Sequence, residues 1–393
     1  MTYTSHQPRT ATARPPADGH RPSPGRAEAV AAARALVPLL AERAGDAERK
    51  RAVHADTVRL LDEARLFDVL TPRAWGGLGL GFDTALLTTA ELSRGCASTG
   101  WLRAVLGGNT WAVAQLPEPA RAEVLAVPGS RTALQLRVAG PPARRVAEGY
   151  LLRDMRGRFC SGIDHARWIL AGIAAPPEPG ADPEPHVMLI PVEETAPVDD
   201  WHTSGLRATG SRSFTVAETV VPAHRVLPLA GLDPACSSGH DGHDGRDGHD
   251  RPAGPAFRMA FTAVGTLPLA GVLLGSARAA LDALVERGRI AAGADVPALY
   301  ARADAAEALL LAGLDRLASS DTPGGTPRER AGVRRDIAWA GTDCRRIVNT
   351  VFEAAGSGAI YDSDPMQRIW RDANAAAQHP TFDLTRWGPP SSA

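Results

Sequence analysis

Lysine is almost absent from this 393-residue sequence: Lys50 is the one lysine, and arginine supplies the rest of the 43 Lys and Arg side chains. Chemistry that forms a Schiff base on lysine would therefore have to use Lys50. The four cysteines, Cys96, Cys160, Cys236 and Cys344, are scattered and form no CxxC pair. This spacing indicates neither a zinc site nor a disulfide framework, and it favours a reducing compartment.

Strong net charge and long apolar runs are also missing. The formal net charge is −1, so no overall field attracts nucleic acid or an anionic membrane. The best apolar run, 264–277, contains Pro268, stops at Arg278 and is shorter than the ~18 residues of a membrane span. The N-terminal residues lack the apolar core of a secretory signal. We therefore expect a cytoplasmic protein with no nucleic-acid or membrane partner.

Common catalytic and metal motifs are absent as well. The sequence has no GxSxG, HExxH or Walker loop. The glycines of 76–81 follow no predicted strand, so they indicate a turn, and the chain has no NAD(P)-binding module. The Gly-His-Asp repeat at 239–250 predicts a solvated loop, because glycine at every third position leaves potential metal ligands unorganised. A specific metal site or adventitious binding are the alternatives there, and we expect no metal.

Hydrophobic periodicity divides the chain into helical and β-rich parts. Helices are expected from Arg26 onward and at 56–67 (N-cap Asp56), 84–94, 97–115, 267–285, 297–319, 327–355 and 365–378; β-prone runs begin at Trp168, Val187 and Phe214. Gly271 and Gly275 lie one helical turn apart and predict close helix packing. The expected units are a disordered tail (1–25), a helical domain (26–128), a β-domain (129–232), a low-complexity loop (233–256), a helical bundle (257–380) and a tail (381–393). The fold class is α+β, mostly α.

The order of helical domain, β-domain and helical bundle resembles the acyl-CoA dehydrogenase superfamily. Three motifs strengthen the resemblance: the loop Gly205–Ser211 with the strand after it, the Val-Pro turn at 221–222, and the late helix signature at 356–373. We therefore expect an acyl-CoA dehydrogenase-like fold.

Further motifs resemble one branch of that superfamily, the oxygenase components of two-component flavin monooxygenases. They are Trp-Gly-Gly at 75–77, Ser-Thr-Gly-Trp at 98–101, Ser-Gly-Ile-Asp-His-Ala at 161–166, and Gln-Arg-Ile-Trp-Arg-Asp at 367–372 followed by His379. The resemblance implies reduced FMN or FAD from a separate flavin reductase and a flavin C4a-hydroperoxide mechanism. It also implies an aromatic or polyketide-type substrate and a homotetramer assembled through the bundle.

Two other functions stay open. An acyl-CoA dehydrogenase or thioester desaturase with bound FAD needs a carboxylate base, and the stretch after Ala373 holds no acid before Asp383. A base on another helix would restore that function. A non-catalytic family member is the third reading. Asn109 and Asn374 stand where many hydroxylases of the branch carry histidines, and the resemblance makes both positions candidate substrate contacts.

The resemblance also implies roles around the flavin, each with a structural alternative. Ser161 would face flavin N5, or serve as a turn serine beside Gly162. Trp101 would wall the pocket, or fill a helix interface. The loop of Thr209, Gly210 and Ser211 would approach the flavin. Asp164 and His165 are expected to fix a turn of the β-domain, and Cys96 and Cys160 to behave as small apolar residues.

Three arginines and one histidine complete the candidate site. The resemblance places Arg258 near the flavin. Arg368 and Arg371 would bind phosphate from a neighbouring subunit, or cap the helix together with Asp372 and Asp364. His379 is a candidate catalytic group, since imidazole can exchange a proton near neutral pH. Its alternative role is a C-terminal helix cap.

Overall fold

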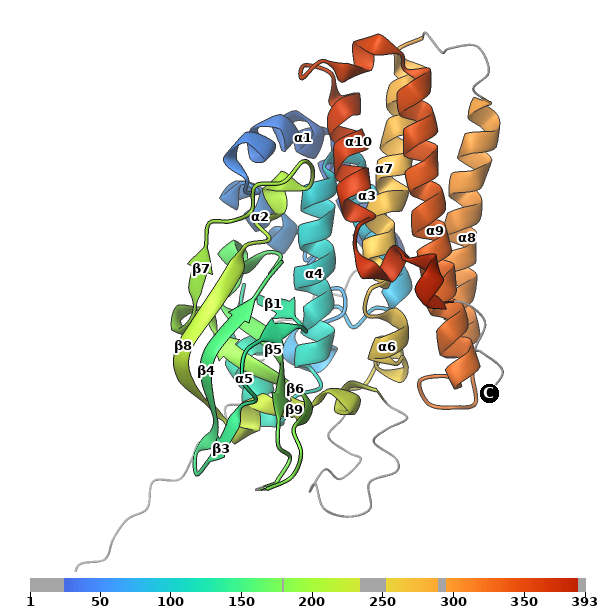
Figure 1. The fold of residues 1–393 in the computed structure, drawn as a ribbon. Coiled ribbons are helices and arrows are strands. Elements are labelled where there is room, and N and C mark those ends of the chain that lie inside the picture. Colours follow the sequence, from blue (N-terminus) through green and yellow to red (C-terminus); the bar gives the residue numbers. More distant parts are fainter. Residues whose placement is uncertain (1–24, 179, 234–251, 289–294, 388–393) are drawn as a thin grey trace, which may run out of the picture.

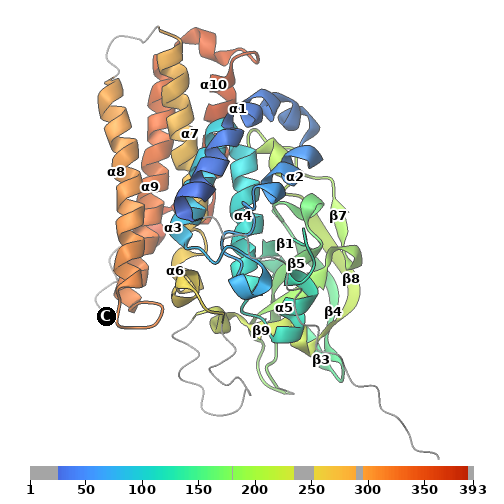
Figure 2. The same ribbon diagram turned by 180° about the vertical axis from the view of Figure 1, so that it is seen from behind.

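The computed structural model describes residues 25–178, 180–233, 252–288 and 295–387. It places N-terminal helices, a β-domain and a helical bundle in chain order (Figure 1, Figure 2). This arrangement confirms the expected fold class. Most of the expected N-terminal tail and the whole Gly-His-Asp repeat at 239–250 lie outside the described residues, so the structure does not test those two expectations.

The N-terminal part consists of helices, with a loop that contains a short 3₁₀ turn at Arg73–Trp75 between the second and third of them. Its helices are α1 Arg26–Lys50, α2 Ala55–Glu63, α3 Phe82–Gly95, α4 Ala97–Val113 and α5 Glu118–Leu125. The expected N-cap Asp56 is wrong, because α2 begins at Ala55 and its N-cap is His54. The helix also stops before Leu66 and Phe67, since Arg65 adopts a left-handed φ of 57° that interrupts the helix. Helix α5 was not expected.

The β-domain is a pair of packed sheets. One sheet has the order β1-β5-β6-β9 and the other β2-β4-β8-β7, with β3 beside β4. The strands are β1 Thr132–Gln135, β2 Val138–Ala139, β3 Arg144–Val146, β4 Gly149–Gly157, β5 Trp168–Ala175, β6 Glu184–Pro191, β7 Ala196–Val198, β8 Ser213–Pro222 and β9 Val226–Pro228. The expected runs at Trp168, Val187 and Phe214 all lie in strands. Their inward side chains, such as Ile169, Met188 and Phe214, are fully buried between the sheets.

The C-terminal part is a bundle of long antiparallel helices after the short α6 Phe261–Val264 (Figure 1). The long helices are α7 Leu267–Glu286, α8 Val296–Ala318, α9 Pro327–Ala354 and α10 Pro365–Ala376. A Cβ on Gly271 or Gly275 would lie 2.6 or 2.1 Å from backbone oxygens of α3. This confirms the predicted close packing. Thr326 and Glu329 form a capping box that fixes the start of α9.

The most apolar helical segment belongs to this core. Phe261–Glu286 is long and apolar enough to cross a membrane. An 18-residue window within it has a mean hydropathy of 1.4, and 83% of this window is buried inside the protein. A buried core helix meets the same criteria of length and composition, so the feature is weak support for a membrane span.

The residues after α10 are packed against the bundle, which corrects the expected tail from 381. Short turns at Pro380–Phe382 and Leu384–Trp387 continue the fold. Phe382 is buried, and Gly341 of α9 leaves the space for its ring. The hydroxyls of Thr266 and Thr381 are 2.7 Å apart, and Arg334 covers the ring of Trp387. These contacts hold His379 in place, one residue before the first turn.

Candidate active site

Helix α4 stands between the β-domain and the bundle, and it carries the first predicted site residue (Figure 1). Trp101 is nearly buried on this helix. Its indole N–H donates a hydrogen bond to Ser161 Oγ at 3.0 Å. Its ring also stands edge-on to the imidazole of His379, with centroids 6.0 Å apart. Trp101 therefore joins two predicted site residues that are 218 positions apart in sequence.

A chain of hydroxyl groups continues from Ser161 into the protein. Ser161 Oγ and Ser211 Oγ are 2.7 Å apart, and Ser211 Oγ and Thr209 Oγ1 are also 2.7 Å apart. The Thr209 hydroxyl then donates to the backbone oxygen of Leu206 at 2.8 Å. Thr209 and Ser211 are buried, whereas Ser161 is partly exposed. The structure thus brings together the predicted residues Trp101, Ser161, Thr209 and Ser211.

Two tight turns of the backbone position the residues that carry these hydroxyl groups. Gly162 has a φ of +78°, and its N–H donates to the backbone oxygen of Thr209 at 3.2 Å. Gly210 has a φ of +54°, and a Cβ there would lie 2.8 Å from Asp164 Oδ2. Left-handed backbone and close approach both favour glycine. Gly210 therefore shapes the loop and leaves the polar contacts to its neighbours.

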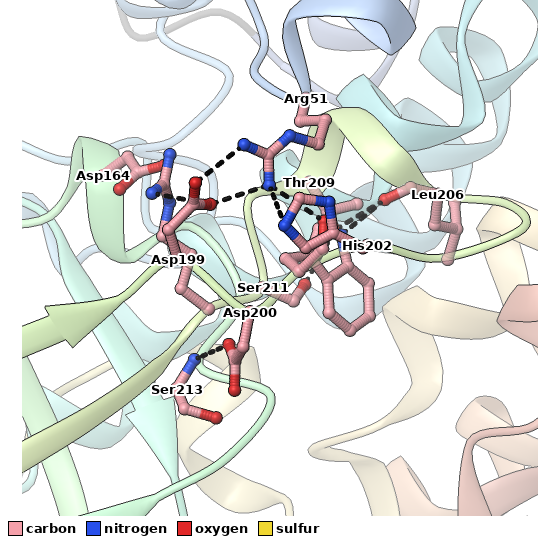
Figure 3. A network of polar contacts seen from close by, with 11 residues as sticks. Arg51, Asp164, Asp199, Asp200, His202, Leu206, Thr209, Ser211 and Ser213 are labelled. Carbon is pink, nitrogen blue, oxygen red and sulfur yellow. Dashed lines mark hydrogen bonds and ion pairs between the residues drawn. The ribbon is translucent and has the colours of Figure 1, made fainter.

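A group of ion pairs ties the same loop to α1 (Figure 3). Asp199 accepts hydrogen bonds from Arg51 at 2.7 and 2.9 Å and from Arg212 at 3.2 Å. Arg212 also donates to Asp164 at 3.0 Å. The two arginines lower the pKa of Asp199, with the Arg51 hydrogen bond as the largest cause. No motif pointed to Asp199, and its place beside Asp200 just before the Gly205–Ser211 motif is the one signal in the sequence.

These contacts agree with the structural reading of Asp164 and His165. Asp164 pairs with Arg212, and the backbone oxygen of His165 accepts from Arg131 at 2.9 Å. Burial lowers the pKa of His165. The neighbouring Cys160 is fully buried, and its burial raises the pKa of the thiol to about 12. Cys160 is therefore the small apolar residue that the sequence predicted.

Asp372 fixes the inner end of the loop to α10. Its carboxylate is buried and accepts from the Leu206 N–H at 2.6 Å. A Cβ on Gly205 would lie 2.2 Å from the backbone oxygen of Arg371, so loop and helix touch along their backbones. Burial raises the pKa of Asp372 to about 6, although the Leu206 hydrogen bond opposes that rise. Asp372 was expected only as part of a helix cap.

His379 follows α10 and caps the next turn. Its Nδ1 accepts from the Thr381 N–H at 3.2 Å, so the imidazole is an N-terminal cap of Pro380–Phe382. The expected C-terminal cap of α10 is wrong in this respect. Burial lowers the pKa of His379 to about 4, and Arg137 and Arg386 add to the effect. At neutral pH the ring is neutral, and because Nδ1 accepts, Nε2 carries the proton.

The two asparagines use their amide groups inside the protein. Asn109 Nδ2 donates to the backbone oxygen of Thr132 at 2.9 Å. Asn374 Nδ2 donates to Asn349 Oδ1 at 3.0 Å and to the backbone oxygen of Trp370 at 2.8 Å. Asn374 therefore links α10 to α9. No contact in the described residues joins either asparagine to the Trp101–Ser161 group.

The predicted arginines differ in their surroundings. Arg371 pairs with Glu48 of α1 and donates to the backbone oxygen of Ser204 at 2.7 Å. Asp364 caps α10 as expected, since its carboxylate accepts from the Met366 N–H at 2.8 Å, but its ion-pair partner is Arg287 and not Arg368 or Arg371. Within the described ranges, Arg258 and Arg368 form no ion pair with a carboxylate. Arg258 is exposed and Arg368 is partly exposed.

The donor set is suited to a flavin in several respects. A flavin ring needs an apolar aromatic wall, neutral hydrogen-bond partners at its nitrogens and cationic groups for phosphate. Trp101 is an aromatic side chain that would suit such a wall, and Ser161 carries a partly exposed hydroxyl. Arg258 and Arg368 form no ion pair within the described residues, although the charge of Arg368 acts on the buried Asp372. No contact among the described residues joins Arg258 to Trp101 or Ser161. In the part of the chain described, no cluster of three His, Cys, Asp or Glu side chains could hold a metal ion.

Comparisons with known proteins agree with this geometry. The family model described as "Acyl-CoA dehydrogenase, N-terminal domain" matches residues 27–118, and that described as "Acyl-CoA dehydrogenase, C-terminal domain" matches 267–384. A pigment production hydroxylase from a Rhodococcus species is 31% identical, over 89% of this chain and 91% of its own. The oxygenase component of an FADH2-dependent resorcinol hydroxylase from a Rhizobium species is 30% identical, over 96% and 94%.

Two solved structures are similar to the chain over most of its length. The HsaA monooxygenase from M. tuberculosis superposes with a TM-score of 0.83 at 28% identity, over 92% of this chain and 95% of its own. XiaF from a Streptomyces species, solved with FADH2 and glycerol, has a TM-score of 0.79 at 27% identity, over 92% and 93%. The chain therefore belongs to the acyl-CoA dehydrogenase family, in its branch of flavin-dependent monooxygenase oxygenase components.

Proposed function

We propose that this chain is the oxygenase component of a two-component monooxygenase. It takes reduced FMN or FAD from a separate flavin reductase and hydroxylates an aromatic or polyketide-type small molecule. The observation that carries the proposal is the contact group of Trp101, Ser161 and His379, where α4, the β-domain and the end of the bundle meet. The reductase would deliver reduced flavin to this chain, either by direct contact or by diffusion of the flavin.

The same group argues against the dehydrogenase alternative. Removing the α-proton of a thioester needs a carboxylate base within hydrogen-bond reach. Among the residues that the structure describes, the hydrogen-bond and ring partners of Trp101, Ser161 and His379 include no carboxylate. Asp372 is engaged with the Leu206 N–H, and Asp383 with Thr385 and Arg386.

Reduced flavin, when bound, supplies the activation of oxygen. The residues of this chain hold and shield it. Ser161 would face flavin N5, Trp101 would form a wall of the pocket, and Arg258 and Arg368 would bind phosphate. Thr209, Gly210 and Ser211 belong to the loop that supports Ser161. Arg371 takes no phosphate, since Glu48 already neutralises it. His379 donates a hydrogen bond through Nε2 toward substrate or oxygen, as its neutral tautomer allows.

Asn109 and Asn374 are proposed substrate contacts through their carbonyl oxygens. Their amide nitrogens are used internally, so each side chain offers Oδ1, which is an acceptor. An acceptor at these positions suits a substrate hydroxyl that donates.

The protein assembles as a homotetramer in the cytoplasm under this proposal. Ile360 and Tyr361, between α9 and α10, are 66% and 67% exposed, and Trp339 of α9 is 38% exposed. Large apolar side chains exposed on one bundle favour association with further copies. The occupant that we propose is a second copy of this chain.

Reconstitution tests the proposed function. The purified chain is combined with a flavin reductase, NADH, FAD or FMN, and a panel of phenols and polycyclic aromatics. Oxygen-dependent formation of a hydroxylated product that needs both proteins supports the proposal. A chain that purifies yellow and reduces its bound FAD with an acyl-CoA would overturn it in favour of the dehydrogenase.

A further inference from the structure

The hydroxyl chain behind Ser161 has a direction that its end groups determine. An indole N–H can only donate a hydrogen bond and a carbonyl oxygen can only accept one. Trp101 Nε1 stands at one end of the chain, 3.0 Å from Ser161 Oγ. The Leu206 carbonyl stands at the other end, 2.8 Å from Thr209 Oγ1. Three hydroxyl groups lie between these two ends, and each has a single proton.

One arrangement of those protons makes all four hydrogen bonds at once. The Leu206 oxygen is the acceptor at its end, and it also accepts from the Trp201 indole and the Thr209 N–H, each at 3.1 Å. Thr209 must give its proton to Leu206, because the carbonyl has none. The 2.7 Å bond between Thr209 and Ser211 then uses the proton of Ser211. The 2.7 Å bond between Ser211 and Ser161 uses the proton of Ser161. Every hydroxyl proton therefore points into the protein, away from the partly exposed end of the chain.

This arrangement determines what Ser161 can offer to a ligand, because Ser161 is the one partly exposed hydroxyl of the three. Its proton is committed to Ser211, and one lone pair accepts from Trp101. One lone pair remains, so Ser161 offers a ligand an acceptor and no donor. Reversing that polarity would break at least one bond in a buried chain, where an unsatisfied hydroxyl is costly. Thr209 is 1% and Ser211 3% exposed, so water does not replace the lost partner.

Reduced and oxidised flavin differ at the atom that Ser161 is proposed to meet. Reduced flavin carries a hydrogen on N5 and donates, whereas N5 of oxidised flavin is a bare nitrogen that accepts. We propose that Thr209 and Ser211 are positioning residues that fix Ser161 as an acceptor and thereby make the site selective for reduced over oxidised flavin. This inference rests on the proposed function, since it requires flavin N5 at Ser161.

The selectivity explains how an oxygenase component avoids product inhibition by spent cofactor. Oxidised flavin is what remains after each turnover, and the reductase pool contains it too. A site that loses one hydrogen bond to the oxidised form releases it and takes up the reduced form. One neutral hydrogen bond changes affinity by roughly three- to tenfold.

The test is an anaerobic binding titration of the full-length protein with FAD, repeated with FMN. Dissociation constants are measured for the oxidised flavin and for the dithionite-reduced flavin. The first variant, Ser211→Ala, removes the acceptor of the Ser161 proton. The second, Thr209→Val, removes the acceptor of the Ser211 proton, so that Ser211 can donate to Ser161 and the Ser161 proton becomes free for a ligand. Thr88→Val is the matched control, because Thr88 is a buried threonine that donates to the backbone oxygen of Thr84 at 2.7 Å in α3.

We expect wild type and Thr88→Val to bind the reduced form more tightly. In Ser211→Ala and Thr209→Val the oxidised form should bind roughly three- to tenfold more tightly, with the reduced form little changed. A tenfold change in that ratio lowers the two-electron potential of the bound flavin by about 30 mV. A merely structural role would instead weaken both forms together.

The failures of the two proposals are distinguishable. If wild type prefers reduced flavin and both variants keep the same ratio, the hydroxyl chain does not set the selectivity. Parallel weakening of both forms in both variants would overturn the inference in the same way. If wild type binds neither form, the proposed function fails and the inference with it. Thermal melting shows whether each variant is folded. If Thr209→Val is unfolded, Ser211→Ala, which removes only one hydroxyl group, still tests the inference.

Discussion

The imidazole of His379 stands edge-on to the indole of Trp101, with ring centroids 6.0 Å apart and planes at 65°. The contact joins the end of the bundle to helix α4, and the same indole donates to Ser161 in the β-domain. Three parts of the chain thus meet at one tryptophan.

His379→Asn should uncouple oxygen use from product formation without unfolding the protein. Asparagine is among the best N-cap residues, so it can keep the cap on Pro380–Phe382 while it removes the imidazole. His379→Ala removes both and should lose about 1 kcal/mol of stability in addition. The measurement is the ratio of hydroxylated product to hydrogen peroxide, beside urea unfolding. An unchanged ratio in His379→Asn would end the catalytic role.

Asp372 and His379 should give opposite pH dependences of stability. The pKa of Asp372 is raised from 3.8 to about 6, so between these values the folded state holds more protons than the unfolded state and stability falls as pH rises. The pKa of His379 is lowered from 6.5 to about 4, so in nearly the same window stability rises with pH.

Urea unfolding at pH 4.5, 5.5 and 6.5 measures both effects. Relative to wild type, Asp372→Asn should become more stable as pH rises through this window, and His379→Asn less stable. Parallel pH profiles for all three proteins would show that neither group titrates differently in the folded state. The two profiles serve as controls for each other, because their expected deviations have opposite sign.

The purified chain alone should not oxidise NADH. The sequence motifs indicate no nicotinamide-binding module, so we expect NADH consumption only when a flavin reductase is added. The absorbance at 340 nm measures it, with chemically reduced flavin as the control that bypasses the reductase. Robust NADH consumption by the chain alone would contradict the two-component function.

Light scattering should show a tetramer at micromolar concentration. Replacing the exposed Ile360 and Tyr361 by serine should lower the measured mass, because association loses apolar area that each copy would bury. A monomeric wild type would contradict the proposed assembly. A tetramer unaffected by both substitutions would place the interface elsewhere on the bundle.

Long periodic segments could be predicted from the sequence with accuracy. Helices α7 to α10 and strands β5, β6 and β8 lie within a few residues of their expected positions, because their hydrophobic periods extend over several turns or a whole strand. Local breaks were less predictable. The early end of α2 depends on the left-handed Arg65, and the packed turns after His379 depend on the space that Gly341 leaves on α9.

The site could be predicted only in part. Motif resemblance identified Trp101, Ser161, Thr209, Ser211 and His379, which the structure places in one group through direct contacts. The resemblance could not show that Arg371 pairs with Glu48, since the two are 323 residues apart. It also gave no sign of the Asp199 ion pairs or of the Asp372–Leu206 bond, which depend on how distant segments pack.

The most direct test of the account is the rate of hydrogen peroxide release when reduced flavin, bound to the protein, is mixed with oxygen. Stopped-flow measurements compare free flavin, wild type and Ser161→Ala. We expect wild type to release peroxide more slowly than free flavin does. We also expect Ser161→Ala, with an unchanged melting temperature, to release it roughly three- to tenfold faster than wild type, since one hydrogen bond is lost. Equal rates for wild type and free flavin, or for wild type and a folded Ser161→Ala, would contradict this expectation.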